Sequence, residues 1–381
     1  MDVTTPTNER PGPVLEEQDG LMPDLPVPSL VASDESSPEL PPIVSPGLED
    51  KPFDLNAAPR LPECWGHRGA SANFPENTLM SFVEACKAGA DGIETDIHMT
   101  SDDELVMFHD PELHRTTDGK GRLHEQPWKG VLEHVRTLEQ PAQPIPRFAQ
   151  LLDLLQQPEN AHVKVNIDCK VENDPVRLFT LIRAELERRP DWETTLAPRL
   201  ILGLWHPKFL EPAMTLLAPL QRFCISMSLS QVRQYFWACT GFSVYYPLLL
   251  GAEGEKFRLE CAAAGKKICT WTVNEREEML QCVRWGVYSV ISDRPELWRQ
   301  LKRDIAGDAK VAKPTFWNET VLPYLTYRNW WFDTRAKERF ETEYLEREGG
   351  KFFVPLTPPL EAVDPVGPAG GVQPLRPSQL V

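Results

Sequence analysis

From residue 61 to about residue 300, short apolar runs alternate with longer segments of helical periodicity, and Gly, Pro, Asn or Asp separates each run from the next. Several of the runs are almost continuous in apolar or β-branched residues, which is typical of strands buried on both faces. An alternation of strands and helices predicts a parallel sheet with crossover helices. This alternation constrains the fold more than any other feature of the sequence.

Nine runs are strand candidates, which is one more than a closed eight-stranded barrel requires. They are Glu63–His67, Gly92–His98, Leu105–His109, Val163–Asp168, Leu200–Leu204, Phe223–Met227, Phe242–Tyr246, Ile268–Val273 and Val287–Ser292. Because all of them lie in one domain of ordinary size, we expect a (β/α)8 TIM barrel instead of an open doubly wound sheet. One candidate must lie outside the barrel, and Phe242–Tyr246 has the weakest support.

Capping residues predict where the intervening helices begin. Asn77 is expected to cap Thr78–Ala88, and Asp174 with Pro175 to open a helix that runs to Arg189. Similarly, Asn274 would cap Glu275–Trp285, with Gly286 ending it, and Asp293 followed by Pro295 would open the last regular helix.

Proline and acidic residues set the two ends of the chain apart. Residues 1–60 hold twelve of the 37 prolines, and twelve acidic against three basic residues, so more than half of the net charge of −16 lies there. We expect disordered tails over 1–60 and 355–381, the barrel over 61–305, and an aromatic-rich extension over 306–354. The remaining charge is slightly negative, so it gives no electrostatic basis for nucleic-acid binding.

The sequence predicts a cytoplasmic protein. Its N-terminus has neither the basic nor the apolar region of a secretory signal, and no apolar stretch reaches the roughly 18 residues of a membrane span. The eight cysteines form no CxxC and are expected to be buried, reduced thiols. Residues 316–332 hold seven aromatics, which would either contact the surface of an intracellular membrane or lipid droplet, or pack over the outer helices.

Acidic residues are found where predicted strands end, and the carboxyl ends of the strands form the active face of such barrels. Glu94, Asp96 and Asp168 would point into one barrel mouth. A divalent cation would relieve their repulsion, and an all-oxygen ligand set favours Mg²⁺ or Ca²⁺. The alternative is a set of ion pairs with Arg68 and Lys170.

Two histidines, His67 and His109, follow the first and third apolar runs beside this predicted metal site. An imidazole pair can donate one proton and accept another near neutral pH. Arg68 and Lys170 supply fixed positive charge suited to a phosphate. Together these groups predict a phosphodiester site. His98 lies on the same strand face as Glu94 and Asp96 and is given no role.

In this order and spacing, the motifs resemble those of the glycerophosphodiester phosphodiesterase family. The matching pieces are His67-Arg68-Gly69-Ala70, Pro75-Glu76-Asn77-Thr78, Glu94-Thr95-Asp96, His109-Asp110, Asp168-Cys169-Lys170, Trp271-Thr272-Val273-Asn274 and Ser292-Asp293-Arg294-Pro295. The segments 200–205 (LILGLW) and 225–230 (ISMSLS) further resemble the fungal branch that includes phosphatidylglycerol phospholipase C. That branch implies an acylated phospholipid as substrate.

The resemblance implies a role for each matching residue. His67 and His109 would be catalytic. The metal would bind Glu94, Asp96 and Asp168, while Arg68 and Lys170 would contact the phosphate and Trp271 the glycerol. Glu76 and Asn77 would support the site. The implied reaction converts a glycerophosphodiester or a glycerophospholipid to an alcohol and glycerol 3-phosphate.

Three other functions remain open at this stage. A zinc amidohydrolase barrel usually needs an HxH pair on its first strand, where this chain has His67-Arg68. A catalytically inactive lipid-binding barrel would keep the fold, although no expected ligand is missing here. A sphingomyelinase-D-like enzyme, or another lysophospholipase-D-type phosphodiesterase, would share the two histidines.

Overall fold

The computed structural model describes residues 61–313 and 322–354, with the side chains of the second range described from residue 334 onward. The predicted disordered tails, 1–60 and 355–381, lie outside the described residues. The aromatic side chains of residues 316–332, on which the predicted membrane contact depends, also lie outside the described residues. Among the described helices, none combines the length and the apolar character that crossing a bilayer requires.

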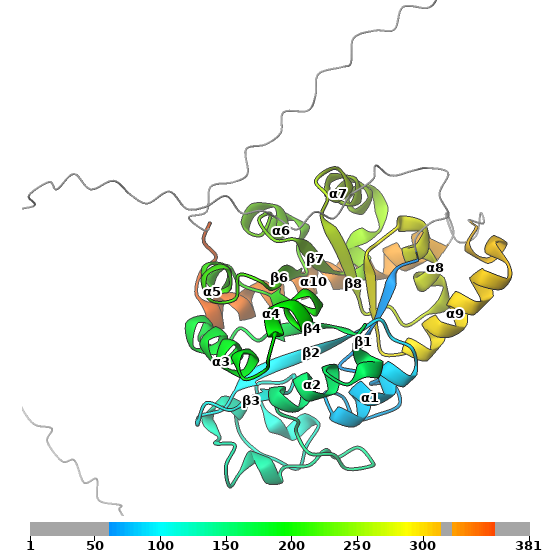
Figure 1. Cartoon of the computed structure of the whole chain (residues 1–381). Helices are drawn as coiled ribbons and strands as arrows, with labels where there is room; N and C mark the ends of the chain where they lie inside the picture. Colours follow the sequence, from blue (N-terminus) through cyan, green and yellow to red (C-terminus); the bar gives the residue numbers. More distant parts are fainter. Residues whose placement is uncertain (1–60, 314–321, 355–381) are drawn as a thin grey trace, which may run out of the picture. The chain divides into compact units, whose positions relative to one another are not determined.

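Eight parallel strands close into a barrel, as the sequence predicts (Figure 1). Strand β1 pairs with β9 on one side and with β2 on the other, which closes the sheet in the order β1-β9-β8-β7-β6-β5-β4-β2. The barrel strands are β1 (Glu63–His67), β2 (Gly92–Met99), β4 (Lys164–Cys169), β5 (Leu200–Leu204), β6 (Gln221–Ser226), β7 (Gly241–Tyr245), β8 (Lys267–Trp271) and β9 (Ser289–Ser292).

The strand outside the barrel is not the one the sequence favoured. Phe242–Tyr246, the weakest candidate, corresponds to β7 and pairs with both β6 and β8. The excluded strand is β3 (Leu105–Met107), which runs antiparallel to β2. It ends at Met107, so His109 lies on the following loop and not at a strand end. Short apolar runs do not reveal strand direction, which here depends on the tight turn between β2 and β3.

Helices surround the barrel. They are α1 (Leu79–Lys87), α2 (Phe148–Leu155), α3 (Pro175–Glu187), α4 (Trp192–Thr195), α5 (Leu210–Leu216), α6 (Leu229–Tyr235), α7 (Gly251–Ala263), α8 (Arg276–Trp285), α9 (Pro295–Gly307) and α10 (Leu322–Gly349). Asp174 caps α3 as predicted, its side chain accepting from the Arg177 N–H at 2.8 Å.

Two of the predicted caps are wrong. Thr78, not Asn77, caps α1, and Glu275, not Asn274, precedes α8. The side chains of Asn77 and Asn274 instead hold Asp96 and Asp293 at the mouth of the barrel. A carboxylate brought near by the fold therefore competes successfully for an asparagine that its local sequence would place at a helix end.

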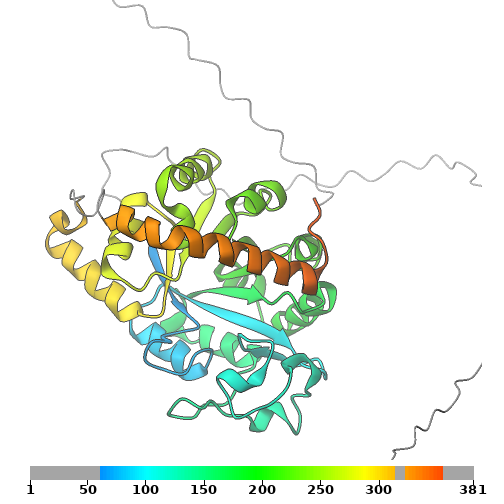
Figure 2. The same ribbon diagram turned by 180° about the vertical axis from the view of Figure 1, so that it is seen from behind.

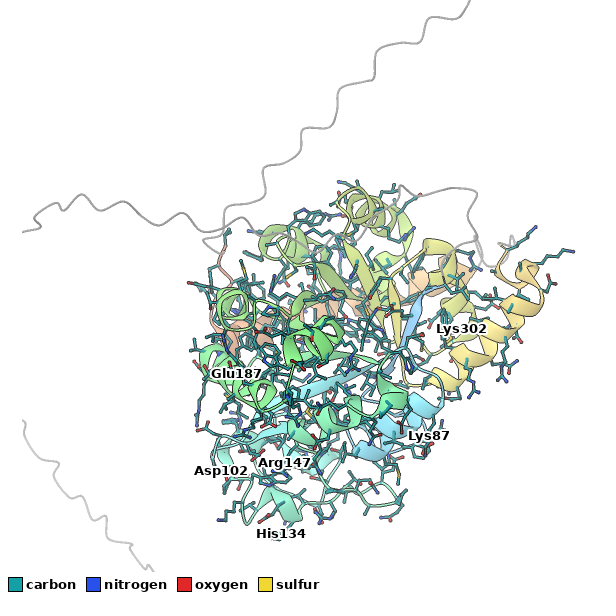
Figure 3. The ribbon with its side chains drawn as sticks, viewed as in Figure 1. Lys87, Asp102, His134, Arg147, Glu187 and Lys302 are labelled. Carbon is teal, nitrogen blue, oxygen red and sulfur yellow. The ribbon has the colours of Figure 1, made fainter. Side chains whose placement is uncertain are left out.

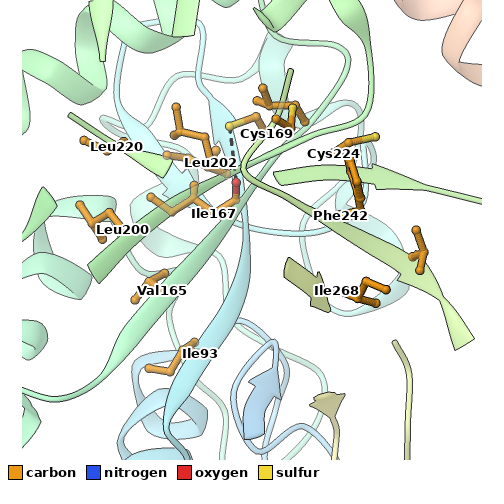
Figure 4. Packing of buried hydrophobic residues seen from close by; sticks show 14 of the residues in the cluster. Ile93, Val165, Ile167, Cys169, Leu200, Leu202, Leu220, Cys224, Phe242 and Ile268 are labelled. Carbon is orange, nitrogen blue, oxygen red and sulfur yellow. Dashed lines mark hydrogen bonds between the residues drawn. The ribbon is translucent and has the colours of Figure 1, made fainter. Parts of the chain in front are cut away.

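Apolar side chains on the outer face of the strands form the main core. Figure 4 shows Ile93, Val165, Leu200, Phe242 and Ile268, all buried, reaching from the barrel toward its helices. Charged residues such as Lys87, Glu187 and Lys302 lie on the outer helices (Figure 3). The eight cysteines are free, and all but Cys86 are buried, which agrees with the sequence analysis.

The segment between β3 and α2 forms a small packed unit of its own. Its core is a separate cluster of buried apolar side chains: Val106, Phe108, Leu113, Leu123, Leu132, Val135 and Ile145. This unit carries His109 and Asp110, so it fixes part of the active face.

Helix α10 is an element that was not predicted from the sequence, where the last regular helix was expected after Pro295. Figure 2 shows α10 crossing one side of the barrel. Its residues contact loops that follow several strands. The Gln231 amide donates to Thr342 at 2.9 Å, and His206 Nε2 donates to the Gly350 carbonyl at 2.9 Å. The sequence signal was obscured because charged residues occur around the whole circumference of the helix.

The turn after β1 depends on Gly69, and its replacement provides a test of the packing. Gly69 has φ +86°, and a Cβ atom there would lie 2.4 Å from Ser81 Oγ. We expect Gly69→Ala to lower the free energy of unfolding by about 2–4 kcal/mol, because it adds overpacking to an unfavourable φ. Gly265 (φ +62°) has open space around it, so Gly265→Ala should cost only about 1 kcal/mol. Urea unfolding of both variants measures the difference, and equal losses would contradict this account of the turn.

Candidate active site

A cavity of about 60 Å³ opens at the carboxyl ends of the barrel strands. Seven of the predicted site residues line it: His67, Arg68, Glu94, Asp96, His109, Asp168 and Trp271. The other three, Lys170, Glu76 and Asn77, contact these residues from the surrounding shell. The fold thus brings together all ten residues that were selected from the sequence.

Three buried carboxylates form the centre of the site. Glu94, Asp96 and Asp168 each place an oxygen atom within 4.8 Å of the others. Lys170 Nζ lies 2.6 Å from Asp96 and 2.9 Å from Asp168, and Arg68 Nε lies 3.6 Å from Asp96. The ion pairs considered as an alternative to a metal are therefore present beside the acidic cluster.

The charges around Glu94 are not fully compensated. Burial raises the pKa of Glu94 well above its usual value, and the charges of Asp96 and Asp168 raise it further. Burial alone would also raise the pKa of Asp96, but Lys170, His109 and Arg68 outweigh it and hold that pKa well below its usual value. Three carboxylates thus share two cationic side chains, and Glu94 receives the least compensation.

The donor set fits a divalent cation. Its three oxygen-bearing side chains are of the type that Mg²⁺ and Ca²⁺ bind, and no histidine or cysteine belongs to the cluster found among the described residues. Glu94, the least compensated of the three, is also the group for which an additional positive charge would be most favourable.

His67 is oriented by an aspartate from the other end of the barrel domain. Its Nδ1 lies 2.6 Å from Asp293 Oδ1. Asp293 also accepts from the Ser71 hydroxyl at 2.9 Å and from the Asn274 amide. Burial would raise the pKa of Asp293, but these hydrogen bonds outweigh it and hold the pKa at about 2. The ring is thus fixed at Nδ1, and its Nε2 faces Glu94 at 4.0 Å.

His109 is oriented in the same way by its sequence neighbour. Its Nδ1 lies 2.6 Å from Asp110 Oδ1. Arg115 holds Asp110 with two donors and reaches Glu76 at 2.6 Å, and Glu76 in turn accepts from Arg68 at 2.9 Å. A continuous chain of ion pairs therefore joins the arginine in the cavity to the carboxylate behind His109.

The electrostatics of His109 favour its neutral form. Burial lowers its pKa below the usual value, and the positive charge of Lys170 adds to that effect. Hydrogen bonds from His109 and Arg115 outweigh the effect of burial on Asp110 and hold its pKa well below the usual range, so Asp110 stays ionised. An ionised carboxylate can only accept, so Nδ1 of His109 carries the proton. Nε2 of His109 is therefore left as a proton acceptor. This arrangement suits a general base.

Asn77 and Trp271 both lie at the mouth of the barrel beside the carboxylates. The Asn77 amide donates to Asp96 at 2.7 Å, and its carbonyl accepts from the Thr95 hydroxyl at 2.7 Å. Asn77 has φ +53°, a left-handed conformation that asparagine tolerates better than most residues. The Trp271 ring forms one wall of the cavity, 5.8 Å from the ring of Trp205.

Several residues that were assigned no role from the sequence also belong to the site. Asp110 and Asp293 are part of the motifs quoted above, but a motif does not show which side chains meet, so their contacts with the two histidines appear only in the fold. Trp205, whose indole N–H donates to both oxygens of Asp168 at 2.9 and 3.0 Å, lies directly after β5. Its position at a strand end was the signal that could have identified it.

A TIM barrel with a buried carboxylate cluster, two aspartate-backed histidines and two cationic side chains at its mouth defines a phosphodiesterase type of site. Comparison with known proteins agrees with this class. Residues 67–297 match the Glycerophosphoryl diester phosphodiesterase family, and because this match spans more than half of the chain, the protein belongs to that family. It is therefore a phosphoric diester hydrolase by family, and the match favours this class over the zinc amidohydrolase alternative.

Similar proteins cover the barrel but not the ends of the chain. A glycerophosphodiester phosphodiesterase of Caldanaerobacter subterraneus is 28% identical over 247 residues, which are 62% of this chain and 96% of that protein. The Glycerophosphodiester phosphodiesterase 1 of Rattus norvegicus is 54% identical over 57 residues, 15% of this chain and 17% of that protein.

Solved structures show the same fold. One is a glycerophosphodiester phosphodiesterase from Agrobacterium tumefaciens, with a TM-score of 0.51 and 19% identity over 63% of this chain and 100% of that chain. Another is an Oleispira antarctica phosphodiesterase in complex with the product sn-glycerol-3-phosphate, with a TM-score of 0.54 and 23% identity over 64% of this chain and 97% of that chain.

The contact between His109 and Asp110 predicts the behaviour of Asp110→Asn. An amide in place of the carboxylate removes the charged acceptor for the Nδ1–H of His109. The His109 tautomer with its proton on Nδ1 is then less favoured, so kcat should fall roughly 10²-fold or more. Because Asp110 raises the pKa of His109, its loss should move the acidic limb of kcat/KM to lower pH. Steady-state rates across a pH series measure both effects.

Asp118 provides the control for this prediction, because it accepts from the Arg136 N–H at 2.8 Å in the same packed unit but does not line the cavity. Asp118→Asn should leave kcat and the pH profile unchanged. An Asp110→Asn variant that behaves like Asp118→Asn would contradict the role given to Asp110.

Proposed function

We propose that this protein hydrolyses a glycerophosphodiester to an alcohol and glycerol 3-phosphate, using His67 and His109 as an acid–base pair. The observation that carries the proposal is the pairing of each histidine with its own aspartate in the cavity that holds the buried carboxylate cluster. The family to which the chain belongs acts on the same class of substrate, and the Oleispira phosphodiesterase has glycerol 3-phosphate as its product.

Glu94, Asp96 and Asp168 would hold one divalent cation, Mg²⁺ or Ca²⁺. When bound, such a cation neutralises charge on the phosphate and lowers the pKa of the attacking oxygen. Arg68 and Lys170 are already oriented toward these carboxylates, at 3.6 and 2.6 Å from Asp96. They would contact the non-bridging oxygens of the phosphate. Trp271 offers its ring as an apolar wall for the carbon atoms of glycerol.

His109 is proposed as the base and His67 as the acid. His109 Nε2 accepts the proton of the attacking hydroxyl, which belongs to water or to the 2-hydroxyl of glycerol. His67 donates a proton to the alkoxide oxygen that leaves phosphorus, and both ring nitrogens of His67 face carboxylate oxygens that can accept from N–H groups. In this step, one P–O bond forms to the attacking oxygen and one breaks to the leaving alcohol. If the attacking oxygen is the 2-hydroxyl of glycerol, the product is a cyclic phosphodiester, which water must then hydrolyse to glycerol 3-phosphate. Each proton transfer contributes roughly 10²–10⁴-fold.

The leaving group is the finer part of the proposal. A water-soluble glycerophosphodiester and phosphatidylglycerol, which would yield diacylglycerol, present the same glycerophosphate to the site. The second candidate rests on the fungal-type segment 200–205, whose Trp205 contacts Asp168 directly. Contact with a membrane through residues 316–332 would accompany an acylated substrate, and it predicts liposome flotation that is lost on truncation before Lys313.

Replacing the proposed catalytic groups tests the reaction. His67→Ala and His109→Ala should each lower turnover of glycerophosphocholine or phosphatidylglycerol by at least roughly 10²-fold. Glu94→Ala/Asp96→Ala and EDTA should abolish it, with Mg²⁺ or Ca²⁺ restoring activity after EDTA. His134, an exposed histidine with a side chain 73% accessible, provides the control, since His134→Ala should retain full activity. Normal turnover in either catalytic variant would overturn the mechanism, and a wild-type protein inactive on all substrates would favour a binding role.

A substrate panel with identified products tests the leaving group. Glycerophosphocholine, lysophosphatidylcholine, phosphatidylglycerol and sphingomyelin are compared with and without chelator. Release of glycerol 3-phosphate from glycerophosphocholine supports the soluble diester, and diacylglycerol from phosphatidylglycerol supports the phospholipid. Choline release from sphingomyelin, with glycerophosphocholine untouched, would contradict the proposed function.

A further inference from the structure

Helix α10 lies outside the segment that matches the family, yet it reaches the active face of the barrel. The match ends at residue 297, whereas α10 begins at Leu322. Lys337 Nζ lies 3.3 Å from the Tyr245 hydroxyl at the end of β7, and Leu345 is almost fully buried. Figure 2 shows the helix crossing the barrel beside the carboxyl ends of several strands. This helix is thus docked against the loops that carry the site.

One contact of α10 leads toward the catalytic centre. The Tyr344 hydroxyl donates to Glu172, which follows β4 two residues after Lys170. The next residue, Asn173, accepts from the Met99 N–H at 3.0 Å and donates to the Ile97 carbonyl at 3.0 Å. These two bonds attach the loop to β2 on both sides of His98.

His98 is a buried histidine that the proposed mechanism does not use. It is 1% exposed, and its Nε2 lies 3.3 Å from the main-chain carbonyl of His109. Because a carbonyl oxygen can only accept a hydrogen bond, His98 Nε2 is the donor in this contact.

His109 needs main-chain support because it lies beyond the end of β3. The Phe108 N–H donates to the Asp96 carbonyl at 3.0 Å, which fixes the chain just before His109. Asp110 fixes the imidazole ring. The bond from His98 contacts the carbonyl of His109 itself, so it restrains the peptide that joins His109 to Asp110.

We propose that His98 is a positioning residue for His109, and that α10 supports it through Tyr344 and Glu172. This inference rests on the proposed role of His109 as the base. Without the bond from His98, the peptide after His109 can rotate, and the ring shifts relative to the substrate. A displacement of about 1 Å in a catalytic group lowers the rate by up to roughly 10²-fold while binding is affected less. The effect should therefore be on kcat and not on KM.

The test compares three variants of the full chain. His98→Leu removes the donor and should lower kcat about 10-fold to 10²-fold with KM within about twofold of the wild type. His98→Gln places a carboxamide N–H near the position of Nε2 and should recover most of kcat. Tyr344→Phe leaves Glu172 without its partner and should lower kcat a few-fold, again with little change in KM.

A matched control uses Asn160, a buried residue whose side-chain amide donates to a main-chain carbonyl, that of Leu154, at 2.9 Å. Asn160 lies before the start of β4, away from His109 and α10. Asn160→Leu likewise removes a buried donor to a carbonyl, so it should lower the unfolding temperature without lowering kcat more than about twofold. Thermal unfolding and the affinity for Mg²⁺, measured by calorimetry on every variant, separate positioning from loss of the fold or of the metal site.

Each outcome is decisive. Wild-type kcat in His98→Leu, or an equal loss of kcat in Asn160→Leu, overturns the proposal. It is also overturned if the kcat of His98→Gln does not exceed that of His98→Leu. Unchanged kcat in Tyr344→Phe overturns the part that involves α10. His109→Ala in the same assay separates this inference from the proposed function. If that variant stays active, the role of His109 is wrong, and if it is inactive while His98→Leu is normal, only the role of His98 is wrong.

Discussion

The burial of three carboxylates at one end of a closed barrel is the constraint on which the rest of the site depends. Glu94, Asp96 and Asp168 lie within 4.8 Å of one another, where their mutual repulsion and desolvation would be costly without nearby positive charge. Lys170 and Arg68 supply part of that charge. Each cation is itself fixed by the fold, since Lys170 follows β4 and Arg68 is in the turn closed by Gly69. The negative charge that these two cations leave uncompensated is greatest at Glu94, and it makes the site suited to a divalent cation. A bound cation would in turn favour an anionic substrate.

Around this centre, the two histidines are held by equivalent contacts from different parts of the chain. Asp293 follows β9 and holds His67, whereas Asp110 is in the packed unit after β3 and holds His109. Both contacts use Nδ1, and both residues line the cavity. The surroundings differ, because Lys170 and burial keep His109 neutral while carboxylates face both nitrogens of His67. This difference in environment is the basis on which we propose His109 as the base and His67 as the acid.

The family motif and the chain around it contribute in different ways. Residues 67–297 contain the groups that would contact a glycerophosphodiester, and the barrel is shared with the bacterial structures. Helix α10 lies beyond the matched segment, but it contacts three residues within that segment, Glu172, Gln231 and Tyr245. These contacts are the basis of our proposal that α10 supports the site by restraining the loop that follows β4.

The sequence by itself determined the barrel, because strand periodicity is a local feature. Polar residues at strand ends, together with the family motifs, also selected ten site residues that the fold brings to one mouth of the barrel. The sequence could not determine that β3 lies outside the barrel, since strand direction depends on pairing. Nor could it show that Asn77 and Asn274 bind carboxylates in place of capping helices. Only the tertiary structure decided that His67 pairs with Asp293, 226 residues away, and that α10 reaches Glu172. These contacts join residues whose separation along the chain leaves no trace in a local pattern, so they exist only once the barrel has closed.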